Sequence, residues 1–379
     1  MGSHWLLEAA APRAAGALNR SPDVIVVGGG VTGCSCALAL AERGFSVRLH
    51  EAREIAGGAS GRNGGFALRG GAMPYPDAVR QLGRDGARAL WRVSERALDT
   101  IESLAGDAIR RVGSLRLAVD AAELDELDAE AEQLEADGFD VERLGELRPP
   151  LEGLFAGGLR HPGDGALQPA RWVRRLAARA AMAGVEIREL SPVSSLDELD
   201  ATHVVIATDG YTNGLAPELD AAIAPTRGQV LVTEPLDSEL FPGPHYARHG
   251  YDYWQQLPDG RLVIGGKRDA ALAEEDTPVE AVTNAVQERL EAEVERLTGA
   301  RPRVELRWAG IWGTTADALP LAGPVPGRDG VWVAAGYSGH GNVLGFACGE
   351  LVGRAIAGES APELALFAPA RLLAPGMPA

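Results

Sequence analysis

The chain has 379 residues, an apolar share of 46%, a formal net charge of −17 and a pI near 4.9. This length allows one large core or two moderate ones, so two domains are expected. The acidity, without a basic stripe, argues against nucleic acids and anionic membranes as partners. Cys34, Cys36 and Cys348 fit neither a disulfide framework nor a metal site, so reduced thiols and no metal are predicted.

Residues 1–19 form an alanine-rich segment that we expect to be an N-terminal extension. It lacks the layout of a signal peptide, because Glu8, Pro12 and Arg13 interrupt it and no Lys or Arg precedes its apolar part. No run approaches the ~20 apolar residues that span a bilayer. A cytoplasmic protein without a membrane span is therefore expected, and whether Gly2-Ser3-His4 is native stays open.

Residues 23–51 have the pattern of a strand, a tight turn, a helix and a second strand. The apolar run Val24–Val27 is followed by Gly28, Gly30 and Gly33 at Gly-x-Gly-x-x-Gly spacing. Such glycines make the turn, admit a pyrophosphate to the backbone and let the helix pack on the strand. Glu51 ends the second strand, where a carboxylate accepts ribose hydroxyls and repels a 2′-phosphate. The pattern predicts a dinucleotide other than NADP.

A second glycine-rich loop, 57–65, follows directly and reads GGASGRNGG. Small residues of this kind let backbone amides pass close to a flat or phosphorylated ligand. A helix is predicted over 77–104, a strand over 112–119, and an acidic helix over 121–136 whose charges form a solvated face. Pro149 and Pro150 mark a boundary.

The next segment brings the chain back toward the nucleotide-binding part. A helix with Trp172, Val173, Leu176 and Ala180 at helical spacing precedes a strand from Val185. The buried strand at 203–209 then ends in a polar turn.

Residues 225–310 are predicted to form the second domain. They contain a strand at 229–233 and a hairpin whose turn is 258–260. Tyr251, Tyr253 and Gln255 share one face of the first hairpin strand. Tyr253 and Lys267 are candidates for substrate contact, with simple core packing as the alternative. A helix is expected to begin at 277 with a Thr-Pro-Val-Glu capping box, and its predicted apolar stripe is Val279, Val282, Val286, Leu290, Val294 and Leu297.

The last segment contains a second strand-to-helix turn rich in glycine. Strand VWVAAG leads into residues 336–342, GYSGHGN, and a helix that runs to about residue 357. Two such turns in one chain favour a single extended ligand that reaches both.

The stretches GGGVTG, HEAR and GASGRNGG resemble the D-amino-acid-oxidase superfamily of FAD-dependent amine oxidoreductases, in particular its gamma-glutamylputrescine oxidase-like branch. The resemblance covers about residues 22–357. It implies an α/β plus α+β fold, with a discontinuous Rossmann-like FAD-binding domain at 20–105, 155–224 and 311–365. It also implies an antiparallel-sheet substrate domain at 106–154 and 225–310, and a C-terminal tail at 366–379.

The resemblance implies bound, noncovalent FAD, since the position of the sarcosine-type cysteine link falls near Gly310. It places a helix N-terminus and, as a catalytic candidate, His340 at the flavin edge that becomes anionic on reduction. A loop histidine that only packs is the alternative for His340. The implied cofactor-binding residues are Gly28, Gly30, Val31, Thr32, Gly33, Glu51, Ala52, Arg53, Ala59, Ser60, Arg62, Asn63, Gly64, Gly65, Val193, Ala207, Thr208, Gly339, His340, Gly341 and Asn342.

Departures from relatives bear on the substrate. Trp312 stands where glycine oxidase-like members carry an arginine for the substrate carboxylate, and Val343 where sarcosine oxidase-like members place a lysine. A free α-carboxylate is therefore not obviously held, although Arg62, Arg69 or Arg268 could substitute. The substrate-contact candidates are Tyr253, Lys267, Trp312 and Arg69.

Two further departures concern the cofactor turn and the electron acceptor. Asp209 replaces the usual glycine after Ala207 and Thr208. Val263 stands where sarcosine oxidases carry the lysine that helps oxygen react, so O2 and another acceptor both stay open.

Flavin chemistry then predicts the reaction. A primary or secondary amine would lose a hydride to flavin N5, and the resulting imine would hydrolyse to a carbonyl compound. Alternatives are a D-amino-acid dehydrogenase, a glycine or sarcosine oxidase, or a non-catalytic flavin-binding partner subunit. The identity of the amine and the oligomeric state stay open.

Overall fold

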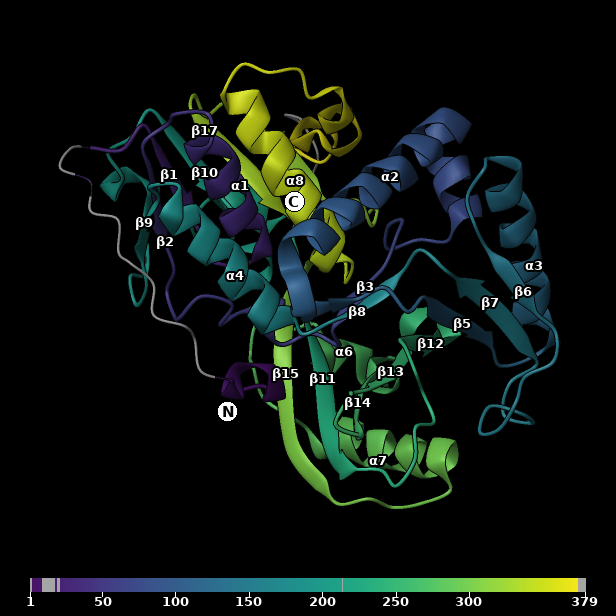
Figure 1. Ribbon diagram of the computed structural model, residues 1–379. Coiled ribbons are helices and arrows are strands. Elements are labelled where there is room, and N and C mark those ends of the chain that lie inside the picture. Colours follow the sequence, from purple (N-terminus) through teal and green to yellow (C-terminus); the bar gives the residue numbers. More distant parts are fainter. Residues whose placement is uncertain (1, 9–17, 19–20, 213, 374–379) are drawn as a thin grey trace.

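The computed structural model describes residues 2–8, 18, 21–212 and 214–373. The predicted N-terminal extension and C-terminal tail therefore lie partly outside the described residues. Two large sheets dominate the fold, with helices on their outer faces (Figure 1).

The six-stranded sheet carries the nucleotide-binding pattern. Its order is β16-β17-β10-β1-β2-β9, and its pairings are parallel except for β16 with β17. All four residues of β1 are buried because both faces of this sheet are covered, as expected for a parallel sheet. The strands are β1 (Val24–Val27), β2 (Val47–His50), β9 (Glu186–Arg188), β10 (His203–Ile206), β16 (Leu321–Pro324) and β17 (Val331–Ala335).

The eight-stranded sheet has the order β15-β11-β14-β13-β12-β5-β7-β6 and is antiparallel except where β12 meets β5. Its strands are β5 (Ser114–Ala118), β6 (Glu142–Leu144), β7 (Gly157–His161), β11 (Ala224–Pro235), β12 (His245–Ala247), β13 (Asp252–Gln256), β14 (Arg261–Gly266) and β15 (Val304–Thr314). A small third sheet consists of β3 (Phe66–Ala67), β8 (Gly165–Leu167) and β4 (Ile109–Arg110). The combination of a mainly parallel and a mainly antiparallel sheet confirms the predicted fold class.

The helices cover the outer faces of the two sheets. Those of the nucleotide-binding part share one core with β1, and α7 packs on the eight-stranded sheet through its buried stripe. The α-helices are α1 (Val31–Ala41), α2 (Tyr75–Ala105), α3 (Ala121–Ala136), α4 (Pro169–Met182), α5 (Pro217–Asp220), α6 (Leu272–Glu275), α7 (Asn284–Thr298) and α8 (Gly341–Ile356). The 3-10 turns are η1 (His4–Leu7), η2 (Ala59–Gly61), η3 (Gly106–Ala108), η4 (Leu196–Glu198), η5 (Asp209–Tyr211), η6 (Arg248–Gly250), η7 (Arg268–Ala271), η8 (Pro362–Phe367) and η9 (Pro369–Arg371).

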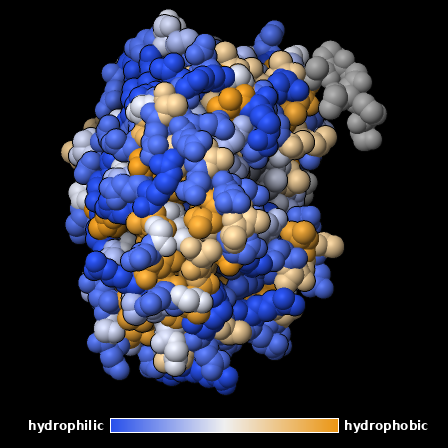
Figure 2. Space-filling view, turned by 90° about the vertical axis from the view of Figure 1, so that its right-hand side faces the viewer, coloured by the Kyte–Doolittle hydropathy of each residue, from blue (hydrophilic) through white to orange (hydrophobic). Residues whose placement is uncertain are grey.

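The acidic helix α3 has the predicted bounds and lies at the edge of the molecule (Figure 1). The face on this side is mainly hydrophilic, with apolar residues in scattered groups (Figure 2). Glu123 and Glu130 are nevertheless buried, and Glu130 forms an ion pair with Arg116 of β5. The helix is thus only partly the solvated face that its composition predicts.

One predicted domain boundary changes. β7 lies in the segment 155–224 that the sequence assigns to the FAD-binding domain, yet it pairs with β5 and β6. The pairing places this strand in the substrate sheet, because the backbone partners of a strand decide its layer. The rest of the division stays a prediction.

The predicted start of the helix at residue 277 is wrong. Helix α7 begins at Asn284 after the N-cap Thr283, and Val279 and Val282 are 57% and 43% exposed. Only the last four residues of the predicted stripe are buried. The carboxylate of Glu280 pairs with other side chains instead of capping a helix, as described below.

Both described chain ends pack on the body. Ser3 and Trp5 are buried, and the Trp5 Nε1 donates to the carbonyl oxygen of Asn63 at 2.7 Å. Near the other end Phe367 is buried and Arg371 pairs with Asp317. In the part of the chain that the structure describes, no helix is long and apolar enough to cross a membrane.

Because His245 of β12 is buried, we expect the folded protein to lose stability in acid. His245 stacks on Trp254 with 5.6 Å between ring centroids, and burial lowers its pKa to about 4. Since the unfolded chain binds a proton below pH ~6.5, the folding free energy contributed by neutral His245 is present above that pH and is lost as the pH falls toward 4.

We expect the wild-type protein to lose about 2 kcal/mol more unfolding free energy than His245→Phe between pH 7 and pH 5. Urea unfolding at the two pH values measures the difference. Equal losses in the two proteins would contradict this assignment.

Candidate active site

A cavity of about 790 Å3 lies between the two large sheets. It is lined by the β1–α1 turn, the 58–64 loop, the end of β10, the β17–α8 turn and residues of the substrate sheet. Its size and mixed apolar and polar lining are typical of a cofactor or substrate site.

The β1–α1 turn presents a helix N-terminus to this cavity. Gly30 is the N-cap of α1 and supplies no side-chain cap, while the Val31 amide donates to Ser60 Oγ at 3.0 Å. Gly28 has a φ of +115°, which favours glycine. The α1 dipole and its free amides suit an anionic diphosphate. Gly33 does not line the cavity; a Cβ there would lie 1.9 Å from the Gly28 oxygen, so it serves close packing.

Glu51 is held at the cavity wall by the backbone. Its Oε2 accepts from the Gly29 amide at 2.6 Å, and its Oε1 accepts from the Arg53 amide at 2.8 Å. Each carboxylate oxygen keeps a lone pair for a further donor. Glu51 can therefore accept ribose hydroxyls, as the sequence predicts. Ala52, Val193, Ala207 and Thr208 line the same end of the cavity.

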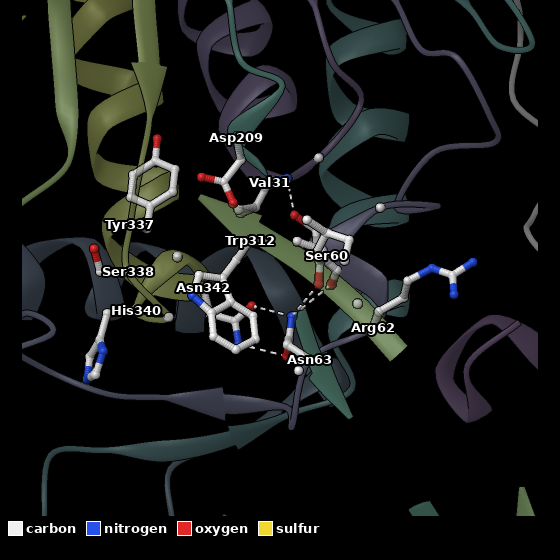
Figure 3. A pocket seen from close by; sticks show the side chains of 18 of the residues that line it. Val31, Ser60, Arg62, Asn63, Asp209, Trp312, Tyr337, Ser338, His340 and Asn342 are labelled. Atoms are coloured by element: carbon white, nitrogen blue, oxygen red, sulfur yellow. Dashed lines mark hydrogen bonds between the residues drawn. The ribbon is translucent and has the colours of Figure 1, made fainter. Parts of the chain in front are cut away.

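Two asparagines join the second glycine loop to the start of α8. The side chains of Asn63 and Asn342 exchange two hydrogen bonds of 3.0 Å (Figure 3). Asn63 also donates to the Ala59 oxygen at 3.1 Å. This pair fixes two predicted cofactor segments that are about 280 residues apart in sequence. Gly65 packs behind the loop and does not line the cavity.

The sequence predicts that Glu280 caps a helix. In the structure its carboxylate instead holds together side chains of the cavity wall. It accepts from Arg53 at 2.8 Å, lies 3.5 Å from Arg62 and accepts from the Tyr211 hydroxyl. The Arg62 side chain consequently points away from the cavity centre (Figure 3). Hydrogen bonds between residues so far apart in the sequence cannot be recognised from a local sequence pattern.

We expect Glu280→Gln to raise the FAD dissociation constant about tenfold, because both arginines lose their shared charge partner. Titration of apoprotein with FAD measures this change. Glu288→Gln, on the exposed face of α7, is the matched control. Equal affinities in both variants would argue against a bracing role for Glu280.

Asp209 is a second partly buried carboxylate, and it accepts hydrogen bonds from two backbone amides. Its Oδ1 accepts from the Gly336 amide at 2.8 Å, and its Oδ2 accepts from the Gly313 amide at 3.0 Å. Burial raises its pKa, and these backbone donors oppose the rise. Asp209, which stands where the family usually has glycine, therefore connects the end of β10 to β15 and to the β17–α8 turn.

His340 is the N-cap of α8 and lines the cavity beside Gly339 and Gly341. Burial lowers its pKa to about 4, so the imidazole is neutral at physiological pH. Its Nδ1 is buried and has no hydrogen-bond partner among the described residues. A neutral imidazole and an uncapped helix N-terminus can both stabilise negative charge on a ligand.

The substrate sheet forms the opposite wall, which we call the roof. In its register Arg116 of β5 lies opposite Tyr246 of β12, and Tyr246 lies opposite Tyr253 of β13. Tyr253 lies opposite Gly265, where a Cβ would come within 2.4 Å of the tyrosine hydroxyl. Glycine at this position therefore leaves the space that the Tyr253 ring occupies.

The four predicted substrate residues differ in their placement. Tyr253 and Trp312 line the cavity. Arg69 also lines it, but its guanidinium is already bound by Asp164 at 3.2 Å and Glu95 at 3.1 Å. The structure corrects the prediction for Lys267, which does not line the cavity because its ammonium pairs with two carboxylates on the far side of the roof.

The lining fits an FAD molecule. Two uncapped helix N-termini, an anchored carboxylate and the unpartnered His340 nitrogen occur in one cavity. Comparison with protein families gives the same answer, since the family described as "DAO: FAD dependent oxidoreductase" matches residues 23–355. The chain belongs to this family.

Relatives of this FAD-dependent oxidoreductase span most of its length. A probable oxidoreductase OrdL of Haemophilus influenzae is 28% identical, covering 91% of this chain and 85% of the relative. A gamma-glutamylputrescine oxidoreductase of Escherichia coli is also 28% identical, covering 89% and 84%. The predicted family, enzyme class and cofactor are thereby confirmed, whereas the individual FAD contacts stay predictions.

Solved structures confirm the fold. Glycine oxidase from Geobacillus kaustophilus superposes with a TM-score of 0.75 at 23% identity, covering 90% of this chain and 96% of that one. L-proline dehydrogenase from P. horikoshii gives 0.78 at 21% identity, covering 93% and 98%.

Proposed function

We propose that this oxidoreductase oxidises the C–N bond of a primary or secondary amine, which yields a carbonyl compound after hydrolysis of the imine. Bound FAD supplies the hydride acceptor. The observation that carries the proposal is the cavity itself, which joins the nucleotide-binding turns to an aromatic roof in one continuous space. The names of the relatives, a gamma-glutamylputrescine oxidoreductase and glycine oxidases, support an amine substrate.

The chain's residues would bind, orient and desolvate the amine. Tyr253 and Trp312 provide apolar walls that exclude water from the reacting carbon. His340 and the α8 N-terminus would stabilise negative charge at the edge of the cofactor. Among the described residues no cysteine lines the cavity.

Position 312 is tryptophan and not arginine. This supports a substrate amine without an α-carboxylate that the enzyme must hold. The acceptor, O2 or another oxidant, is left open in this proposal. Incubation with gamma-glutamylated amines, polyamines, sarcosine, D-amino acids and aminophosphonates, followed by mass spectrometry of the products, tests it. A carbonyl product and the matching smaller amine are expected. Turnover of only free D-amino acids or glycine would replace this proposal by the amino-acid oxidase alternative.

A further inference from the structure

Arg268 differs from the other arginines that line the cavity. Among the described residues it has no carboxylate within ion-pair distance, whereas the other four each have at least one. Those four are Arg53 and Arg62, which share Glu280, Arg69 with Glu95 and Asp164, and Arg116 with Glu130. Although the net charge of the chain is −17, the described residues supply no carboxylate partner for this arginine.

Two aromatic rings hold the Arg268 guanidinium in place. Its central carbon lies 5.0 Å from the centroid of Tyr251 and 5.8 Å from that of Trp312, both of which line the cavity. Both distances are within the ~6 Å of a cation–π contact. A cation–π contact uses no hydrogen-bond acceptor, so the N–H groups of the guanidinium are left for a ligand, and their fork geometry matches a carboxylate.

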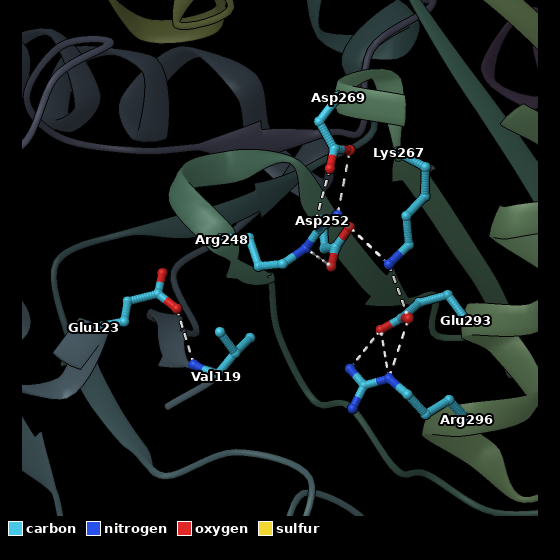
Figure 4. A network of polar contacts seen from close by, with 8 residues as sticks. All are labelled: Val119, Glu123, Arg248, Asp252, Lys267, Asp269, Glu293 and Arg296. Carbon is cyan, nitrogen blue, oxygen red and sulfur yellow. Dashed lines mark hydrogen bonds and ion pairs between the residues drawn. The ribbon is translucent and has the colours of Figure 1, made fainter. Parts of the chain in front are cut away.

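The two sequence neighbours of Arg268 are fixed by ion pairs (Figure 4). The Lys267 ammonium lies 2.9 Å from both Asp252 and Glu293, and Asp269 lies 2.8 Å from Arg248. Lys267 also has a left-handed backbone with a φ of +58°. Residues 267 and 269 are thereby tied to β13, η6 and α7, while the residue between them lines the cavity. We assign Lys267 a positioning role in place of the predicted substrate contact.

This end of the cavity reaches solvent. His249, which also lines the cavity, has a side chain that is 52% exposed, and Arg268 itself is partly exposed. His340 and Gly341, at the start of α8, line the cavity at the β17–α8 turn. A ligand that extends from the cofactor-binding turns to this solvent-exposed part of the cavity can therefore contact Arg268.

We propose that Arg268 binds a carboxylate at the end of the amine substrate remote from the reacting nitrogen. This inference rests on the proposed function and narrows its substrate class to amines with a distal carboxylate. It is compatible with Trp312, because the carboxylate need not be on the reacting carbon.

The test uses the FAD-loaded enzyme and pentanoate, which lacks an amine and cannot be oxidised. Calorimetry and the shift of the flavin absorbance report its binding. We expect binding to the wild type, a ten- to hundredfold loss in Arg268→Gln and partial recovery in Arg268→Lys. Arg289→Gln removes the same charge from the exposed face of α7 and should bind like wild type. No binding to the wild type, or equal binding by Arg268→Gln, would overturn the proposal.

A second arm separates this proposal from the proposed function. Straight-chain amines are compared with ω-amino acids of equal length for anaerobic reduction of the bound flavin. A preference for the ω-amino acids that disappears in Arg268→Gln supports the distal site. Reduction by both series at equal rates overturns the site and leaves amine oxidation intact, whereas pentanoate binding without reduction by any amine rejects the oxidation and retains the anion site.

Discussion

Replacing Gly30 by aspartate is expected to give a folded protein that no longer retains FAD. Gly30 has an extended backbone, φ −80° and ψ −174°, and is the N-cap of α1, a position where aspartate stabilises helices. A Cβ there would meet Ser60 Oγ at 2.9 Å, and this hydroxyl can rotate away. The new carboxylate would take the amides of the first turn and repel the diphosphate, so we expect affinity to fall about a thousandfold.

Flavin absorbance after purification measures cofactor retention, and far-UV circular dichroism checks that Gly30→Asp is folded. Gly30→Ala serves as the control because it adds the Cβ without the charge, and it should keep most of the FAD. Full occupancy in Gly30→Asp would mean that the diphosphate does not bind at α1.

Removing the Asp209 carboxylate should be the most destabilising single change at the site. In Asp209→Ala the amides of Gly313 and Gly336 are left buried without an acceptor, and each such loss costs about 1 to 3 kcal/mol. The total is about 2 to 6 kcal/mol of unfolding free energy. Because these amides belong to β15 and to the turn before α8, we also expect weaker FAD binding.

Chemical unfolding of the FAD-free protein measures the stability term separately from cofactor loss. Asp209→Asn keeps one acceptor oxygen and should lose less than Asp209→Ala. Asp329→Ala is the control, because Asp329 is exposed and its replacement should change the unfolding free energy little. Equal stability of wild type and Asp209→Ala would mean that water satisfies both amides.

The parts of the fold with a strong local signal could be predicted. The glycine spacing at residues 28–33 and the apolar run before it determine a strand, a turn and a helix whatever lies elsewhere. The acidic helix α3 begins after Asp120, whose side chain accepts from the Glu123 amide, and this cap is readable from the sequence. The burial of Glu130 cannot be predicted from the sequence, because its partner Arg116 lies outside the helix, in β5.

The residues that prediction misplaced are governed by ion pairs across the fold. A Thr-Pro-Val-Glu run has the letters of a capping box, yet Glu280 meets Arg53, which is more than 200 residues away. Lys267 has the residue type expected of a substrate contact, but Asp252 and Glu293 hold it on the other side of the sheet. That Arg268 has no carboxylate partner in the described part of the chain is visible only once the partners of the other cavity arginines are known.

The central claim, amine oxidation with FAD as the hydride acceptor, is tested most directly by adding amines to the purified enzyme without oxygen. At least one amine of the panel is expected to bleach the oxidised-flavin absorbance band, and the band is expected to return once a suitable acceptor is supplied. An absorbance band that stays unchanged with gamma-glutamylated amines, polyamines, ω-amino acids, sarcosine, D-amino acids and aminophosphonates would contradict it.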